Sequence, residues 1–157
     1  MNFKKILTVA VLSASVFALS GCSLSRNVES LKPYAPSDGT QLNLENVKAR
    51  NFLIVKGESN QALLIGSLVA AKDGNVTVQT QDGRGAKVEF SIATKAGVKS
   101  DIGYNGTEGF KFNLPAEEIA GNMYSVYLND GTGPVELLVP IVDGTLEEYR
   151  PFAEKLG

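Results

Sequence analysis

Few residues of this 157-residue chain could carry out chemistry by their type and spacing. There is one cysteine, Cys22, and no histidine, so the usual general base and the commonest metal ligand are absent. Adjacent carboxylates occur at Glu117-Glu118 and Glu147-Glu148. Adjacent acids point in different directions on a helical turn, and an acid–base pair needs a buried cleft to separate its pKa values. We therefore interpret these glutamates as solvating charge and predict that the protein is not an enzyme.

The same inventory predicts no metal site and no cofactor. Carboxylates and amides do not suit soft metals, and the calcium-loop pattern is missing around the five Asp-Gly dipeptides. A serine nucleophile would lack its histidine, and Ser30-Leu-Lys32 is one residue short of Ser-x-x-Lys. The glycine-rich segment Gly103–Gly109 matches neither the dinucleotide fingerprint nor the P-loop. We interpret this segment as a long flexible loop.

The chemistry that the sequence does support is lipidation of Cys22. A basic start, Met1–Lys5, precedes an apolar stretch, Ile6–Phe17, which has the length of a signal-peptide core and is too short to span a membrane. The tetrapeptide that follows, Leu19-Ser20-Gly21-Cys22, resembles the lipobox of bacterial lipoproteins. This resemblance implies a thioether-linked diacylglycerol on Cys22 and cleavage after Gly21. Two acyl chains hold a protein stably on a bilayer, whereas one chain does so marginally.

Removal of residues 1–21 would leave a mildly acidic protein on a short tether. Residues 22–157 carry 13 basic and 17 acidic side chains, a net charge of −4, which excludes a general nucleic-acid surface because such binding needs dense Lys and Arg. Residues 22–38 contain two prolines and no sustained period, and we interpret them as the lipidated cysteine and a flexible tether. Fully extended, the tether reaches at most ~50 Å. The alternative is that Val28–Tyr34 forms an ordered first strand or arm.

The body, residues 39–144, is predicted to be β-sheet. Ala86–Ala93 places Val88, Phe90 and Ile92 on one face and polar residues on the other, the period-two pattern of a half-buried strand. Similar patterns or short apolar runs fill seven further segments. These segments are Thr40–Val47, Asn51–Lys56, Ala62–Ala71, Asn75–Gln81, Gly109–Leu114, Met123–Leu128 and Pro134–Val142.

Turn signals between these segments predict the fold class. Asp-Gly and Asn-Gly dipeptides accept the positive φ of tight turns, and Asp73-Gly74, between two strand-like runs, gives the strongest prediction of a hairpin. Seven or eight short strands with regular turns predict an all-β fold, an Ig-like antiparallel β-sandwich. The Cys…Trp…Cys signature of Ig domains is absent, so the likeness is one of architecture.

Two short segments outside the strands have helical features. Pro115–Ile119 could form one helical turn, with proline at its first position. In residues 145–157, Thr145–Glu148 matches a capping box, and we expect Pro151 to stop such a helix early. A short terminal helix and an extended tail therefore remain as alternatives.

Strand segments also carry a family resemblance. They are Leu44–Val47 with Asn51–Val55, the Ala62–Ala71 run, and Pro134–Gly144 with Thr145–Tyr149 behind it. With them, the body resembles small extracytoplasmic lipoproteins of actinobacteria, whose sandwich is similar to that of periplasmic copper chaperones. Copper chaperones of that kind bind Cu(I) through two histidines and two methionines. This chain has no histidine and, after residue 21, one methionine, Met123, so the resemblance does not carry the copper function with it.

These observations favour a lipid-anchored protein on the extracytoplasmic face of a bacterial cell membrane, acting as a non-catalytic binding or adaptor module. The partner would be an envelope protein or polymer. A carrier of a small ligand or metal is the alternative, and an enzyme acting through carboxylates is a third. A closed apolar pocket would favour the carrier function, and a cleft with two converging acids would favour an enzyme. A flat apolar patch would favour the adaptor function. Candidate exposed anchors are Tyr104, Tyr127 and Tyr149.

Overall fold

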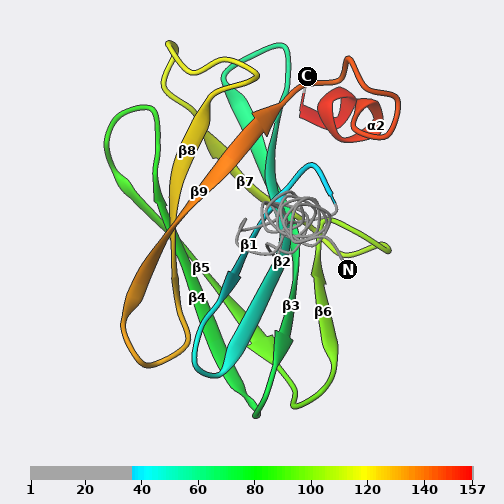
Figure 1. Ribbon diagram of the computed structural model, residues 1–157. Helices are drawn as coiled ribbons and strands as arrows, with labels where there is room; N and C mark the ends of the chain where they lie inside the picture. The colour runs from blue at the N-terminus through cyan, green and yellow to red at the C-terminus, as the bar shows by residue number, and fades with distance from the viewer. Residues whose placement is uncertain (1–36, 157) are drawn as a thin grey trace, which may run out of the picture. The chain divides into compact units, whose positions relative to one another are not determined.

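The computed structural model describes residues 37–156 (Figure 1). The predicted signal peptide, the lipobox Leu19–Cys22 and the possible arm Val28–Tyr34 lie outside this range, as does the tether up to residue 36. In the described range, no helix is long and apolar enough to cross a membrane.

Nine strands make up most of the described chain. They are β1 (Thr40–Asn43), β2 (Val47–Lys56), β3 (Gln61–Ala70), β4 (Gly74–Gln81), β5 (Lys87–Thr94), β6 (Lys99–Ile102), β7 (Phe110–Asn113), β8 (Met123–Asn129) and β9 (Pro134–Val142). A short helix, α2 (Arg150–Ala153), and a 3₁₀ turn, η2 (Glu154–Leu156), follow them.

The strands form two halves of a sandwich-like sheet. One half has the order β5-β4-β8-β9, and the other is β2-β3-β6, with β1 also beside β2 and β7 also beside β3. The halves join where β2 and β9 run parallel, with Ile54 opposite Ile141. The other strand pairs of the described chain are antiparallel. The predicted all-β sandwich is confirmed, and the parallel β2–β9 pair is a feature that the antiparallel prediction did not include.

Eight of the nine strands correspond to the eight predicted segments, and β6 is the additional one. The first segment ends earlier than predicted, because a tight turn in which the Leu44 N–H donates to the Val47 carbonyl (2.8 Å) separates β1 from β2, and Val47 already belongs to β2. Strand β6 was not predicted, since Lys99–Ile102 contains one apolar residue and shows no alternation. Pairing with β3 holds this segment extended.

The hairpin predicted at Asp73-Gly74 was wrong. Strand β3 pairs with β2, β6 and β7, whereas β4 pairs with β5 and β8, so this connection passes from one half of the sandwich to the other. The Asp73 carboxylate does not close a two-residue turn but accepts a hydrogen bond from the Ala96 N–H (2.8 Å). A turn dipeptide thus marked the reversal of the chain without specifying which strands pair.

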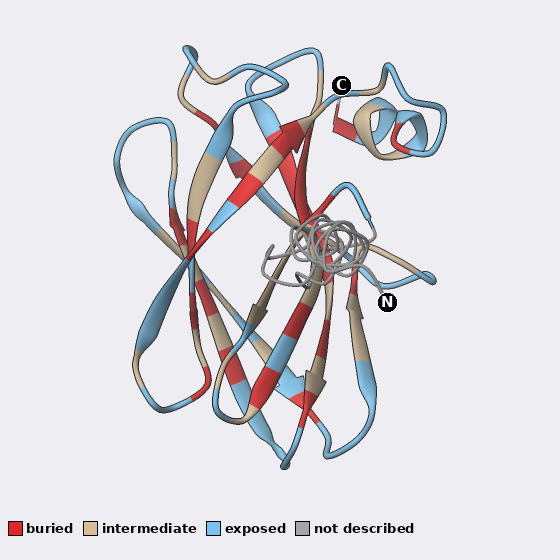
Figure 2. Cartoon of the chain, viewed as in Figure 1, coloured by how far each residue is buried: buried red, intermediate tan, exposed pale blue. Residues whose placement is uncertain are grey.

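The main core lies between the two halves. Strands β2 and β3 contribute fully buried side chains such as Phe52, Leu64 and Leu68, and the other half contributes Val78 and Val126. Figure 2 shows buried and exposed positions alternating along the strands. This alternation is the pattern expected when one face of each half meets the core and the other meets solvent.

Strand β2 departs from this rule at a bulge. Asn51 adopts a positive φ of 51°, and the register with β3 shifts between Arg50 and Leu53. Beyond the bulge, Leu53 and Val55 point to the outer face, where they form a second buried cluster with Leu63 and Ile65 of β3. Burial on both faces explains why residues 52–55 are a continuous apolar run.

The C-terminal segment covers this second cluster. Tyr149 and Leu156 are buried in it, and Phe152 packs against it. Of the two alternatives for the tail, the short helix is present, but the expected capping box and early stop at Pro151 were wrong. Helix α2 begins at Arg150 with proline in its first turn, where the missing N–H costs nothing, and no side chain caps it.

Candidate binding surface

The glutamates singled out in the sequence do not come together. Glu117 and Glu118 lie between β7 and β8, in a turn closed by the Glu118 N–H and the Pro115 carbonyl (3.1 Å) rather than in the helical turn that we considered possible. Glu147 and Glu148 are exposed between β9 and α2. Glu118 accepts a hydrogen bond from Asn122 (3.0 Å). Each pair therefore lies in its own loop.

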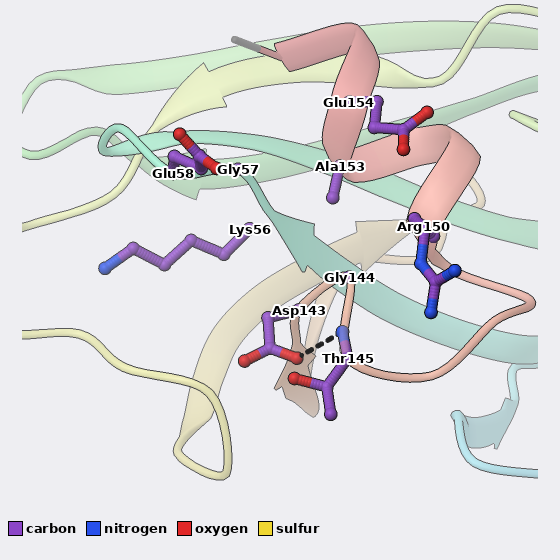
Figure 3. A pocket seen from close by; sticks show the side chains of 9 residues that line it. All are labelled: Lys56, Gly57, Glu58, Asp143, Gly144, Thr145, Arg150, Ala153 and Glu154. Atoms are coloured by element: carbon purple, nitrogen blue, oxygen red, sulfur yellow. Dashed lines mark hydrogen bonds between the residues drawn. The ribbon is translucent and has the colours of Figure 1, made fainter.

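A polar pocket of about 700 Å³ lies beside the C-terminal helix (Figure 3). Its lining consists of charged and small residues: Lys56, Gly57, Glu58, Asp143, Gly144, Thr145, Arg150, Ala153 and Glu154. The Lys56 ammonium donates to the backbone carbonyl of Glu118, so it is directed at the loop before β8. Figure 3 shows the carboxylates of Glu58, Asp143 and Glu154 pointing in different directions. Within residues 37–156, no group of three or more His, Cys, Asp or Glu could hold a metal ion.

Helix packing accounts for the shape of this pocket. A Cβ on Gly57 would lie 2.7 Å from the Cβ of Leu156, and one on Gly144 would lie 3.0 Å from the Cβ of Ala153. The two glycines therefore let the C-terminal segment approach β2 and the end of β9. Hydrogen bonds from Thr145 keep the pKa of Asp143 below its usual value. The pocket is thus a junction of local turn and packing contacts.

The three tyrosines proposed as surface anchors have different surroundings. Tyr149 is buried, and its hydroxyl donates to Asp38 (2.8 Å). Tyr104 is half-buried; its hydroxyl accepts from Asn51 (3.1 Å), and its ring meets Phe152 edge-on. Tyr127 is exposed on β8. Tyr104 and Tyr149 therefore hold the bulge and the C-terminal segment together, and Tyr127 alone of the three is exposed.

Tyr127 belongs to an apolar strip on the outer face of β8 and β9. We define the β8–β9 strip as Met123, Tyr127, Leu138 and Pro140, of which the first three are exposed. The register places Met123 opposite Pro140 and Ser125 opposite Leu138. Leu138 is therefore the diagonal neighbour of both Met123 and Tyr127, within reach of their side chains. These residues therefore cluster on one outer face, where Ser125 also lies between Met123 and Tyr127.

Polar groups lie within the strip and beside it. Glu136 accepts hydrogen bonds from Ser125 (2.6 Å) and Tyr127 (3.4 Å). On the β4 side, a hollow of about 340 Å³ is lined by Gln81, Glu118, Met123, Tyr124, Ser125 and Tyr127. Burial raises the pKa of Tyr124, and the charge of Glu118 raises it further, while the Tyr124 hydroxyl donates to the Gln81 carbonyl (3.1 Å). Apolar and aromatic side chains combined with hydrogen-bonded polar groups are usual components of a protein interface.

Sequence reasoning missed Met123, Leu138 and Pro140 of the strip, although the sequence contained a signal for this surface. In the predicted strand Pro134–Val142, the alternation places Val135, Leu137, Val139 and Ile141 on one face, which is the core face. Leu138 is an apolar residue in the opposite, solvent-facing phase. By the same alternation, Met123 shares a face with Tyr127. Apolar residues in the polar phase of two strands that pair with each other were the signal for this surface.

Comparison with known proteins finds similarity in structure alone. No family model and no curated protein matches the chain. Among solved structures, it is similar to the copper-bound PCuAC domain from PmoF2, with 12% sequence identity, a TM-score of 0.50, and coverage of 66% of this chain and 98% of that one. It is also similar to the apo PCuAC domain from PmoF1, with 10% identity, a TM-score of 0.49, and coverage of 66% and 99%. The first likeness shows the fold and, at that level, supports the predicted similarity to copper chaperones.

The residues of this chain do not fit a copper site of the expected composition. The chain has no histidine, and the methionine of the described range, Met123, lies exposed on the strip. A single thioether does not hold soft Cu(I). That the protein binds no copper stays a prediction.

Proposed function

We propose that this protein is a lipid-anchored, non-catalytic binding module of the bacterial cell envelope, which contacts a partner protein through the β8–β9 strip. The observation that carries this proposal is the cluster of exposed apolar side chains Met123, Tyr127 and Leu138, which has the hydrogen-bonded Ser125 and Glu136 among its members. Exposed apolar patches with polar rims mark interaction sites. The hollow beside Tyr127 offers a place for a partner side chain to insert, which is the usual form of an interface hot spot.

The strip predicts how partner capture responds to a single charge. Leu138→Asp should lower the yield of a crosslinked adduct in intact cells by about tenfold or more, because a central apolar contact is worth roughly 2 kcal/mol or more. The measurement is in-cell chemical crosslinking, with quantification of the adduct by mass spectrometry. The matched control is Val98→Asp, since Val98 and Leu138 are both 52% exposed and Val98 lies between β5 and β6. Equal adduct yields for the two variants, at equal protein levels, would count against the strip.

The anchor predicts a separate result. Cys22→Ser should leave an unprocessed precursor that incorporates no labelled fatty acid, because the lipobox predicts that the Cys22 thiol is the group to which the lipid is attached. Metabolic labelling followed by membrane fractionation checks this expectation. Ser23→Ala is the control, because Ser23 is the neighbour of Cys22 and its substitution leaves Leu19–Cys22 unchanged. Normal maturation and labelling of the Cys22→Ser protein would refute the anchor while leaving the strip untouched.

A further inference from the structure

Strand β5 has an open backbone edge. It pairs with β4 along all eight residues, from Lys87 opposite Gln81 to Thr94 opposite Gly74. In the described range, no hydrogen bond joins its other edge to another element. Strand β9 pairs with β2 only through Ile141 and Val142, and the rest of that edge carries Pro134 and Pro140, which suit an edge that does not pair. Strand β5 contains neither proline nor a bulge, so its free N–H and C=O groups can accept another strand.

The core-facing row of β5 is incompletely covered. Val88, Phe90 and Ile92 are each half-buried. Their direct partners on the same face of β4, which are Thr80, Val78 and Val76, are at most 3% exposed. Burial therefore falls off sharply from β4 to β5. An added strand with apolar residues at alternate positions would extend the core face and cover this row.

A groove marks the place where such a strand would meet the other half of the sandwich. It has a volume of about 700 Å³, and Phe90, Phe110, Leu63 and Phe152 are among its lining residues. The rings of Phe90 of β5 and Phe110 of β7 stack with centroids 4.3 Å apart. Exposed Lys111 and Lys155 also line the groove, and the acidic group among its lining residues is Glu108. The groove thus combines an aromatic floor with an excess of positive charge.

We propose that β5 accepts an extended segment of a partner protein as an additional strand of the sheet. Backbone hydrogen bonds to the open edge would supply affinity, as in other strand-addition complexes. Alternate apolar side chains of the segment would cover Val88, Phe90 and Ile92, and acidic residues between them would meet Lys111 and Lys155. This surface lies at the opposite edge of the β5-β4-β8-β9 half from the strip and does not depend on it.

The test uses the full-length protein in detergent micelles and synthetic peptides. The probe is a nine-residue peptide with valine at alternate positions and glutamate between them, and its control has the same composition in scrambled order. Successive amides of a strand point to opposite edges. N-methylation of one alternate set of amides should therefore weaken binding roughly tenfold or more, and methylation of the other set should leave it within about twofold. Equal effects of the two sets, or equal binding of the scrambled peptide, would overturn the proposal.

Two further measurements locate the site. Bound peptide should slow amide hydrogen exchange in residues 87–94 and leave residues 134–140 of β9 unchanged. The double variant Lys111→Glu/Lys155→Glu should reverse the preference, so that a valine–lysine peptide binds better than the valine–glutamate one. Lys95→Glu is the control, since this exposed lysine does not line the groove. Peptide binding without protection of residues 87–94, or an unchanged charge preference, would assign the groove to some other ligand and refute strand addition.

Discussion

Deletion of residues 149–157 is expected to abolish the stable fold of the body. The C-terminal segment covers Leu53, Val55, Leu63 and Ile65 on the outer face of β2 and β3, and none of these four is more than 4% exposed. Burial of one such side chain contributes ~1.5–3 kcal/mol, so uncovering four costs roughly 6 kcal/mol or more. That loss is comparable with the total stability of a typical domain, about 5–15 kcal/mol. Urea denaturation followed by circular dichroism measures the effect, and a cooperative transition near that of the full-length chain would contradict it.

Point substitutions separate packing from simple loss of chain length. Leu156 is 4% exposed within the cluster, whereas Leu146, which precedes the covering segment, is 48% exposed. Leu156→Ala should therefore lower the free energy of unfolding by about 2 kcal/mol or more, and the matched Leu146→Ala should change it by less than about 0.5 kcal/mol. Equal effects would show that the segment does not act as a cover.

The Tyr149 hydroxyl should make the stabilising effect of the C-terminal segment depend on pH in the alkaline range. Burial and the hydrogen bond to Asp38 raise the pKa of Tyr149. A raised pKa in the folded state means that the contribution of this group is fully present below its unfolded pKa of about 10 and is lost as the pH rises above that value. Tyr149→Phe should cost about 1 kcal/mol at neutral pH. Above pH 10, the stability of this variant should fall less steeply than that of the wild type.

The sequence predicted the fold class because strand periodicity is a local signal. Ala86–Ala93 and Pro134–Val142 alternate clearly, and both are strands with nearly the predicted bounds. Strand β6 shows what this signal misses: Lys99–Ile102 is extended because β3 pairs with it, and its own residues favour no particular state. The pairing of β3 with β7 rather than β4 is likewise set by tertiary contacts, which turn residues such as Asp73-Gly74 do not encode.

Long-range packing also limited what could be predicted about the surface. The local sequence does not distinguish the three candidate anchors Tyr104, Tyr127 and Tyr149. Tyr149 is nevertheless buried, because a bulge over 90 residues earlier in the chain turns Leu53 and Val55 outward. Asn51 at that bulge could not be recognised in advance, since a positive φ at a non-glycine residue within a strand has no simple local pattern. Leu138, in contrast, could have been placed on the outer face from alternation alone.

The close contact between Phe52 and Gly66 should produce the largest effects of single substitutions in the main core. Phe52 is fully buried, and a Cβ on Gly66 would lie 2.6 Å from Cδ2 of its ring. Phe52→Ala should lower the free energy of unfolding by about 3–5 kcal/mol, through lost burial and the cavity left behind. Gly66→Ala should cost about 1–3 kcal/mol, because the added methyl group forces the ring or the β3 backbone to shift. Thermal and urea denaturation of both variants gives the two values.

A matched glycine and a double variant show whether the ring itself causes the cost at Gly66. Gly74 has no heavy atom within 4 Å of an added Cβ, so Gly74→Ala should be neutral or stabilise by up to about 1 kcal/mol, through loss of freedom in the unfolded chain. Leucine at position 52 would leave room beside β3. Gly66→Ala should therefore cost less in a Phe52→Leu background than in the wild type, a coupling of about 0.5–3 kcal/mol between residues in contact. Strictly additive effects, or a Gly74→Ala cost equal to that of Gly66→Ala, would contradict the prediction that contact with the Phe52 ring causes the cost of Gly66→Ala.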